Sequence, residues 1–355
     1  MTSPPAPEGK HRRPVTRWIV RGVLFVALVA GVFGLLPRLG GLRHDAAGLR
    51  HARPAFVAAA FVAQAVSLAC YALLYRRVLA SLGARLRFRV AAEVTLSTFL
   101  ISHVTPFGSA TGTLLNVSTL EAEGIAASTT GEAIGLTSLV STIALIALFG
   151  TGLMATAGRH VSAGYLRIAG IAVVLVLLVL ALALLVGAHP SIAERAGRRA
   201  AGWARHIRPS IDPEKVAQTS GRLVRLARSA LTGRAFAESY GFASADLLFD
   251  LLSLDLMFLA FRYQPGFGPL AVAYAVANIA SAIPLTPGGL GVIEVTLVAI
   301  TVGFGAPRAT AVIAVLGYRV VNYWLPLIPG GVAYLRLRLN LNTAAKAKPA
   351  SPPAG

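Results

Sequence analysis

Charged residues are scarce in this chain, at 13% of its 355 residues, whereas a soluble globular domain has about 25%. Acidic residues are the scarcer kind, because 14 Asp and Glu face 33 Lys and Arg, which leaves a net charge of +19. Cysteine occurs once, at Cys70, so a disulfide framework and a thiolate metal cluster are both excluded. With 55% hydrophobic residues and a mean hydropathy of +0.69, the composition indicates a polytopic membrane protein.

The excess of basic residues would favour nucleic acid binding in a soluble chain. Here the cations lie mainly in loops beside apolar stretches, where they match anionic lipid headgroups and the positive-inside rule. We therefore expect no nucleic acid partner. The sequence also holds no metal-ligand set and no nucleotide-binding loop, so we expect no metal and no cofactor. The Ala- and Arg-rich composition favours a bacterial protein of the inner membrane, and the positive-inside rule places both basic termini in the cytoplasm.

The apolar stretches predict an all-α transmembrane domain over residues 18–336, between two polar ends. Residues 1–17 are basic and Pro-rich and residues 337–355 are low in complexity, so both ends are expected to be disordered. A basic insertion at 187–236 is predicted to be cytoplasmic and to include an amphipathic surface helix at Gly221–Phe236. About six full spans are predicted, at Trp18–Leu36, Pro54–Tyr75, Ala133–Ala157, Tyr165–Val186, Ser239–Phe261 and Ala309–Leu335.

The stretch Ile283–Ala299 breaks this apolar pattern, because it holds two prolines and three glycines within eight residues. Proline removes a backbone donor and glycine is a poor helix former, so a helix must break at Pro284–Gly289 and restart near Leu290. Broken backbone at membrane depth is tolerated only where it is buried in protein or lines a wet cavity. Glu294, one turn after the break, is therefore a candidate functional residue.

The first half of the chain contains a similar break at His103–Gly112, and one constant shift in residue number places the first break on the second. The two segments belong to a first repeat at about 54–157 and a second at about 239–335. The matched pairs are Thr105 with Thr286, Pro106 with Pro287, Gly108 with Gly289, Gly124 with Gly305 and Thr129 with Thr310.

The positive-inside rule favours a re-entrant hairpin at each break, over Val90–Leu120 and Phe267–Gly303, because only hairpins leave the basic insertion and the basic tail inside. Three spans separate the two hairpins, so they would enter from opposite sides and form an inverted repeat. The alternative is that both segments are kinked single spans. The loop Pro37–Pro54, with four arginines on the predicted outer side, favours that alternative.

The restarted helix would point free N–H groups and its positive dipole end into the membrane, which makes an anion site. A phospholipid phosphate is the obvious anion there. The alternative is a packing kink in which Glu294 bonds to a neighbouring helix. The candidate headgroup-binding residues are Thr105, Pro106, Gly108, Thr286, Pro287, Gly288, Gly289, Gly291, Glu294, Arg319 and Asn322.

Charged side chains inside two later spans are further candidates. Arg319 shares a helix face with Asn322 and could either neutralise Glu294 or hold a phosphate. Asp246 and Asp250 share a face at i, i+4 spacing, which suits proton coupling or a cationic headgroup. The alternative for the two aspartates is an ion pair with Arg262 or Arg319.

The motif T-P-G-G-L-G-V-I-E, which contains Pro287, Gly288, Gly289, Gly291 and Glu294, resembles the lysylphosphatidylglycerol synthase transmembrane-region family of flippase-like proteins. The resemblance extends over Trp18–Leu335. In the first repeat the Thr105–Gly108 stretch departs from the more polar stretch that members often carry. Bifunctional members add a cytosolic aminoacyltransferase domain, for which the chain has no room before Gly355. The resemblance therefore implies the translocating part alone, without enzyme activity.

We therefore expect a protein that moves a lipid headgroup between leaflets. The lipid would be an anionic or aminoacylated phospholipid or a lipid-linked sugar. Without an ATP-binding motif, movement would be downhill, proton-linked or driven by the membrane potential. One alternative is an enzyme acting on a lipid-linked substrate, with Glu294 or the aspartates as acid and base. Another is a scaffold whose basic loop recruits a lipid-modifying enzyme.

Overall fold

The computed structural model describes most of the predicted transmembrane domain, and the described residues form helices and no strand, which confirms the all-α prediction. The predicted spans Trp18–Leu36 and Tyr165–Val186, the N-terminal segment 1–17 and most of the predicted surface helix Gly221–Phe236 lie outside the described residues. The described residues are 52–104, 108–156, 190–205, 212, 214, 216–218, 221, 233–281 and 286–347.

Within these residues, three helical stretches are long and apolar enough to cross a membrane: α3 (Pro54–Ser81), α6 (Ala127–Thr156) and the stretch Arg308–Leu337. A fourth long helix, α10 (Gly233–Ala260), matches the 28 residues of α3 and carries the aspartates. At a rise of about 1.5 Å per residue, 28 residues extend about 42 Å, more than the hydrocarbon core of about 30 Å.

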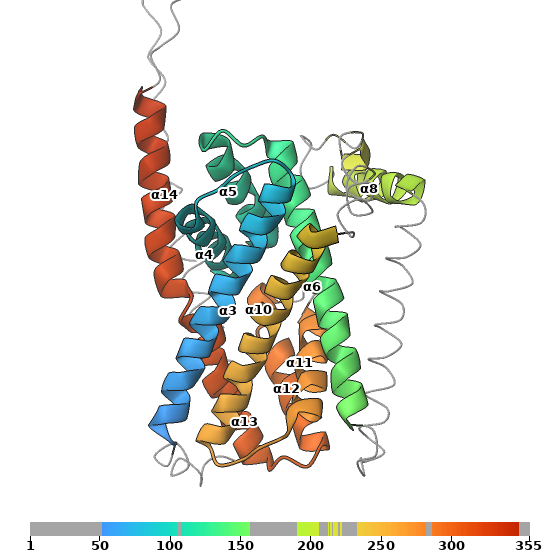
Figure 1. Ribbon diagram of the computed structural model, residues 1–355, viewed down its shortest axis with the longest axis vertical. Helices are drawn as coiled ribbons and strands as arrows, with labels where there is room; N and C mark the ends of the chain where they lie inside the picture. The colour runs from blue at the N-terminus through green and yellow to red at the C-terminus, as the bar shows by residue number, and fades with distance from the viewer. Residues whose placement is uncertain are drawn as a thin grey trace, which may run out of the picture.

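Two pairs of shorter helices contain the predicted breaks. The first pair is α4 (Phe88–Val104) and α5 (Gly108–Ala122), which pack against each other. The second pair is α11 (Phe267–Ser281) and α12 (Val292–Gly303), which also pack together, with the short 3-10 helix η1 (Pro287–Gly289) between them. The pairs occupy opposite halves of the molecule, α4 and α5 towards the top of Figure 1 and α11 and α12 below.

The bounds of the helices recur along the chain. Helix α3 begins at position 54 and ends at 81, and α10 begins at 233 and ends at 260, so a single shift relates both their ends. The same shift relates the start of α4 at 88 to the start of α11 at 267. After the breaks the shift is slightly larger and equals the one found in the sequence, since α6 begins at 127 and α13 (Arg308–Arg319) at 308.

The turns that follow the two helix pairs share one backbone geometry. Gly124 has a φ of 82° and Gly305 a φ of 95°, a left-handed conformation that suits glycine. In each turn the residue after this glycine, Ile125 or Ala306, donates its N–H to the carbonyl oxygen five residues earlier. The shift found in the sequence therefore recurs in the backbone hydrogen bonds.

Helices α3 and α10 run antiparallel and pack along their length. Arg53 N–H, just before α3, donates to Ala260 O at the end of α10 over 3.0 Å. Helices α6 and α11 also approach closely, because a Cβ on Gly152 would lie 2.8 Å from Ala271 Cβ. Small residues at such contacts let helix backbones pack where no water drives association.

The last helical stretch changes its helix type directly after Arg319. After Arg319 it becomes a π-helical turn, η2 (Val320–Trp324), and α14 (Leu327–Ala347) follows. Pro326 has no N–H to give to the helix, which accounts for the local change. Residues 337–347 are helical, where the sequence predicts a disordered tail. Their Ala, Leu, Arg and Lys residues favour a helix, and no proline or glycine interrupts them.

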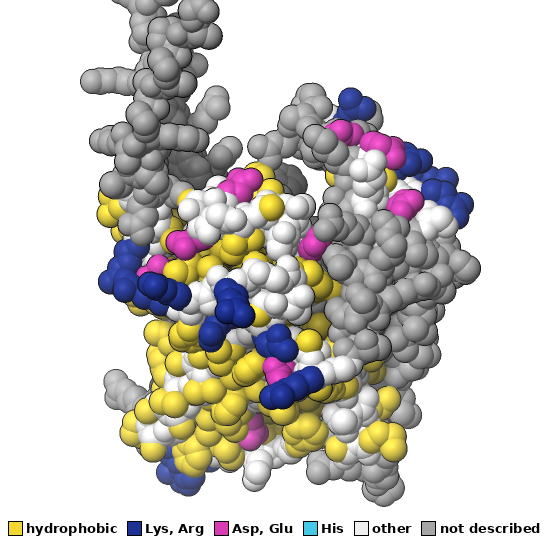
Figure 2. Space-filling model, turned by 45° about the horizontal axis from the view of Figure 1, so that its top comes forward, with side chains coloured by type: hydrophobic (Ala, Val, Ile, Leu, Met, Phe, Trp, Pro, Cys, Tyr) yellow, Lys and Arg dark blue, Asp and Glu magenta, His cyan; other side chains and the backbone are white. Residues whose placement is uncertain are grey.

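The described polar connections gather at one end of the molecule. The turn between α5 and α6, the amphipathic α8 (Pro190–Ala204) and the C-terminal end of α14 lie together at the top of Figure 1. In Figure 2 hydrophobic side chains cover most of the lower part of the visible face, and most Lys and Arg side chains lie above them. This distribution is typical of a protein surface that passes from lipid into an aqueous, anionic headgroup region.

Candidate functional site

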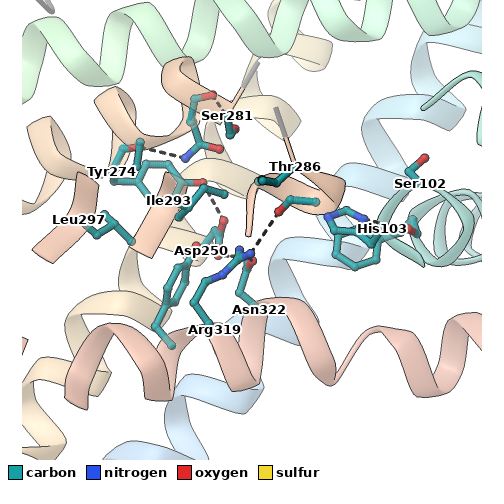
Figure 3. A pocket seen from close by; sticks show the side chains of 16 residues that line it. Ser102, His103, Asp250, Tyr274, Ser281, Thr286, Ile293, Leu297, Arg319 and Asn322 are labelled. Atoms are coloured by element: carbon teal, nitrogen blue, oxygen red, sulfur yellow. Dashed lines mark hydrogen bonds between the residues drawn. The ribbon is translucent and has the colours of Figure 1, made fainter. Parts of the chain in front are cut away.

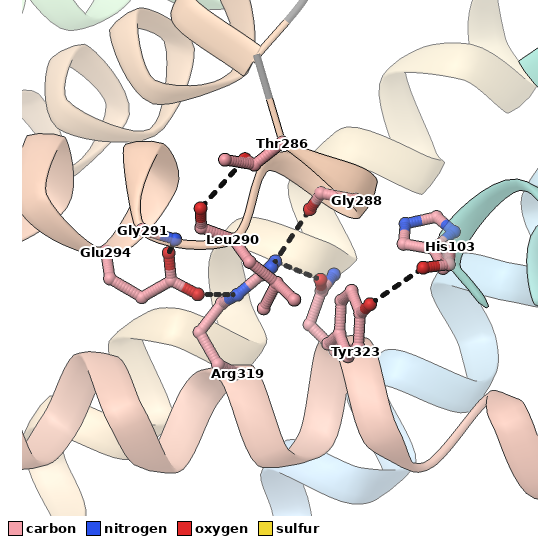
Figure 4. Close-up of polar contacts among 9 residues, drawn as sticks. His103, Thr286, Gly288, Leu290, Gly291, Glu294, Arg319 and Tyr323 are labelled. Atoms are coloured by element: carbon pink, nitrogen blue, oxygen red, sulfur yellow. Dashed lines mark hydrogen bonds and ion pairs between the residues drawn. The ribbon is translucent and has the colours of Figure 1, made fainter. Parts of the chain in front are cut away.

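The break in the second helix pair is made by glycines in left-handed conformations. Gly288 has a φ of 62° and Gly291, the N-cap of α12, has a φ of 86°. Helix α12 begins at Val292, close to the predicted restart near Leu290. Thr286 Oγ1 donates to Leu290 O over 2.8 Å and closes the turn (Figure 4).

The N-terminus of α12 is capped by its own carboxylate. Gly291 N–H donates to Glu294 Oε2 over 2.6 Å. The sequence predicts free N–H groups here that would receive a lipid phosphate. The structure differs, because Glu294 lies in the first turn of α12 and places its negative charge at the positive end of the helix.

Glu294 also forms a buried ion pair with Arg319, whose Nε lies 2.7 Å from Glu294 Oε1 (Figure 4). The side chains are 0% and 2% exposed, respectively. Arg319 Nη2 donates to Gly288 O over 3.2 Å, and its guanidinium lies 4.8 Å from the centre of the Tyr323 ring. Of the two roles left open for Arg319, the structure shows neutralisation of Glu294.

The two helix pairs meet through Tyr323. Its hydroxyl donates to His103 O, at the end of α4, over 3.0 Å. A Cβ on Gly288 would lie 2.5 Å from Tyr323 Cε2 and 2.8 Å from His103 Cδ2, so the glycine permits this approach. The predicted site residues Thr105 and Pro106 lie outside the described residues. Gly108 begins α5.

Asp250 lies at the centre of a hydrogen-bond cluster of uncharged donors. Tyr274 donates to its Oδ2 over 2.7 Å, and Tyr318 and Asn322 donate to its Oδ1 over 3.0 and 2.8 Å. Asp246, one turn earlier, accepts a hydrogen bond from Ser67 of α3 over 2.7 Å. The ion pairs found in the described part of the chain do not include either aspartate, so the alternative of a pairing with Arg262 or Arg319 is not seen there.

Two cavities meet beside Asp250. The first, which we name the Arg319 cavity, has a volume of about 460 Å³ and is lined by residues of α4, α10, α11, η1, α12, α13 and η2. Figure 3 shows Asp250, Arg319 and Asn322 pointing towards one another, with His103 approaching from α4. The lining of the Arg319 cavity includes the predicted residues Thr286, Gly288, Gly289, Arg319 and Asn322 together with Asp250.

The second, which we name the hydroxyl cavity, has a volume of about 450 Å³ and is lined by residues of α3, α4, α5, α6, α10, α11 and η2. Asp246 and Asp250 both line it. The two cavities adjoin, because several residues line both of them, including residues of each helix pair. The shared residues are Phe99, Ser102, His103, Asp250, Tyr274, Asn278 and Asn322.

The structure thus separates the predicted residues into two groups. Gly291 and Glu294 hold the broken backbone and do not line either cavity, whereas Arg319 does both. Of the four residues that donate to the aspartates, Asn322 was a predicted site residue and the other three were not; they are Tyr274, Tyr318 and Ser67. Hydroxyl groups are common in membrane helices, so a single Tyr or Ser gives no signal. Among the described residues, no group of three His, Cys, Asp or Glu side chains gathers as metal ligands would.

The model of one protein family, described as the transmembrane region of lysylphosphatidylglycerol synthase, matches residues 19–330. This range covers both helix pairs, both cavities and the buried ion pair.

Individual relatives match over shorter segments. A UPF0104 membrane protein of Methanothermobacter thermautotrophicus is 29% identical over 85 residues, 24% of this chain and 25% of the relative. The inner membrane protein YbhN of Escherichia coli is 37% identical over 62 residues, 18% and 20% of the two chains. A UPF0104 membrane protein of Methanocaldococcus jannaschii is 27% identical over 95 residues, 27% and 28%. The aligned segments therefore span little more than a quarter of these relatives at most.

Proposed function

Since the chain belongs to the family of the lysylphosphatidylglycerol synthase transmembrane region, we propose that it moves the polar headgroup of a membrane lipid between leaflets. The observation that carries the proposal is the pair of adjoining cavities beside Asp250, inside an apolar helical protein. Ionisable and polar groups are costly at such depth and lie where a polar substrate passes. The headgroup would occupy the cavities while its acyl chains remain in the bilayer.

The cavity sizes suit this task. Their volumes of about 460 and 450 Å³ fall within the range of about 300–1,000 Å³ that is typical of small-molecule sites. Because they adjoin through residues of both helix pairs, a headgroup could pass from one to the other. Their linings combine residues of both helix pairs, which supports access from each leaflet in turn.

In this proposal the helix pairs α4–α5 and α11–α12 are re-entrant hairpins of an inverted repeat. The recurrence of helix bounds under nearly constant shifts, from α3 to α10 and from α6 to α13, supports it. So does the position of the two pairs in opposite halves of the molecule. The end that holds the α5–α6 turn and α8 would be cytoplasmic, since arginines follow α3 there.

The residues have separate roles. The Glu294–Arg319 pair holds the broken backbone at the edge of the Arg319 cavity, so this cavity keeps its shape. Asn322 and Asp250 would contact the headgroup. Asp246 and Asp250 are placed for proton coupling, since both line the route and neither is neutralised by an ion pair among the described residues.

The test uses the purified chain in proteoliposomes that contain one of two fluorescent lipids, a phospholipid or a glucosyl diacylglycerol, with leaflet accessibility followed by reductive quenching. We expect the parent to equilibrate the leaflets faster than protein-free liposomes. Asn322→Leu keeps the size of the side chain but removes its bond to Asp250, and it should lose most of this activity. Val320→Leu, at a side chain 46% exposed and outside both cavities, should keep it. Equal rates in parent and Asn322→Leu would contradict the route.

A second candidate function is an enzyme acting on a lipid-linked substrate, because two carboxylates line the hydroxyl cavity. An enzyme changes its lipid, whereas a transporter returns it unaltered. Mass spectrometry of the lipids recovered from the same proteoliposomes therefore separates the two functions.

A further inference from the structure

Several residues that line the hydroxyl cavity carry a buried polar atom that the fold itself does not use. In the described part of the chain, six buried side-chain oxygens have no hydrogen-bond partner, and five of them belong to residues that line this one cavity. These residues come from three helices. They are Gln64 of α3, Thr95 and Thr98 of α4, and Thr137 and Ser141 of α6.

Three of the five are almost wholly buried: Gln64 is 2% exposed, Thr95 8% and Thr137 1%. Nearly all buried polar groups in folded proteins are paired, so a cluster of unpaired ones around a cavity requires an explanation. A rotation of about 120° about χ1 moves the hydroxyl of a threonine to the former position of its methyl group, and helical threonines populate two such rotamers. Each threonine can therefore turn its hydroxyl towards a ligand at little cost.

The charge of the lining excludes one class of ligand. The hydroxyl cavity is lined by Asp246 and Asp250 and, among the described residues, by no Lys or Arg. A phosphate placed here would lie beside two carboxylates without a cation to neutralise it. The anion expected from the sequence is therefore a poor ligand for this cavity.

The hydrogen bonds of Asp250 disfavour an ammonium group beside this carboxylate as well. Both oxygens of Asp250 already accept bonds, two of them at Oδ1 and one at Oδ2. An ammonium ion only donates, so it would compete with Tyr274, Tyr318 and Asn322 for one carboxylate. The unused groups are instead hydroxyls, which both donate and accept, and one amide oxygen.

We propose that the hydroxyl cavity binds an uncharged polyhydroxyl group, a sugar or polyol carried by the lipid. Each ligand hydroxyl can donate to Gln64 Oε1 or exchange bonds with the threonines, so the orphaned atoms on three helices are satisfied together. Tyr71 and Phe99 provide apolar ring surface in the same lining. The proposal rests on the proposed function and specifies its substrate class.

The test measures binding to the full chain in nanodiscs of phosphatidylcholine. The probes are monoglucosyl diacylglycerol, phosphatidylglycerol, lysyl-phosphatidylglycerol and free glucose. We expect the glucosyl lipid to bind most tightly. Thr137→Val removes a hydroxyl without changing side-chain size. It should weaken binding of the glucosyl lipid about threefold to tenfold, as expected for one hydrogen bond.

The same substitution should leave the melting temperature unchanged or raise it, because the hydroxyl has no partner in the protein alone. A merely structural threonine would show the opposite result. The matched control is Thr301→Val, at a threonine 1% exposed whose hydroxyl bonds to Leu297 O over 2.7 Å and lines neither cavity. It should lower the melting temperature slightly and leave binding unchanged.

The outcomes separate this proposal from the proposed function. If phosphatidylglycerol or lysyl-phosphatidylglycerol binds more tightly than the glucosyl lipid and is translocated, the substrate class is wrong and the transport function stands. If the glucosyl lipid binds with the predicted loss in Thr137→Val but no lipid is moved, the site stands and transport fails. If free glucose binds as tightly as the glucosyl lipid, the ligand is a soluble sugar and the lipid-borne group is wrong. Unchanged binding in Thr137→Val overturns the proposal.

Discussion

The buried pair between Glu294 and Arg319 makes the sharpest prediction about stability. Glu294→Gln keeps the shape of the side chain but leaves the guanidinium of Arg319 at 2% exposure without a counter-charge. It also weakens the cap on Gly291 N–H, since a neutral amide is a poorer acceptor than a carboxylate. Breaking a buried pair from one side typically costs about 3–5 kcal/mol, so we expect a loss of this size.

The double variant Glu294→Gln/Arg319→Gln isolates the interaction between the two side chains. It leaves no unpaired charge, so it should be more stable than Glu294→Gln alone, with a coupling energy of about 0.5–3 kcal/mol. The assay is reversible unfolding in mixed micelles by titration with sodium dodecyl sulfate, followed by circular dichroism. Additive effects of the two substitutions would refute the structural role and favour ligand contact for Arg319. So would single losses within the range of about 0.5 kcal/mol that is usual for surface substitutions.

Three further predictions concern backbone approach and charge. Gly288→Ala should cost well over the roughly 1–2 kcal/mol expected for Gly124→Ala. Both positions have positive φ, but a Cβ collides with neighbours only at 288; equal melting temperatures would contradict this. Gly152→Leu should separate α6 from α11 and lower the yield of folded protein in size-exclusion chromatography, whereas Gly150→Leu, with open space around its Cβ, should not. Asp250→Asn should make translocation insensitive to an imposed pH gradient, if a proton travels with the lipid; an unaltered response would remove the aspartate from coupling.

The broken helix was predictable because its causes are local. Prolines and glycines between Pro284 and Gly291 cannot continue a helix in any surroundings, so the restart of α12 at Val292 falls close to the predicted Leu290. Pairing of Glu294 with Arg319 was one of two alternatives. A buried acid and a buried base on neighbouring helices of an apolar protein stabilise each other, and the structure shows this pair.

The hydrogen-bond cluster around Asp250 and the hydroxyl cavity were not predictable in the same way. Asp250 is held by residues of α11, α13 and η2. Asp246 is held by Ser67 of α3, which is far away in the sequence. Such convergence depends on how helices distant in sequence pack. The self-capping of α12 by Glu294 escaped prediction for another reason. A break of this kind suggests an open anion site, but the acid three residues after the N-cap already satisfies it.

The central claim is that a lipid headgroup enters the cavities between the two helix pairs. It is tested most directly with a glucosyl lipid that carries a photoreactive diazirine on its headgroup, cross-linked in proteoliposomes and mapped by mass spectrometry of the digested protein. We predict adducts at cavity residues such as Ser102, Asn278 and Thr137, competed by unlabelled glucosyl lipid. Adducts confined to exposed outward-facing side chains such as Val62 and Met154, 64% and 75% exposed, would contradict the claim.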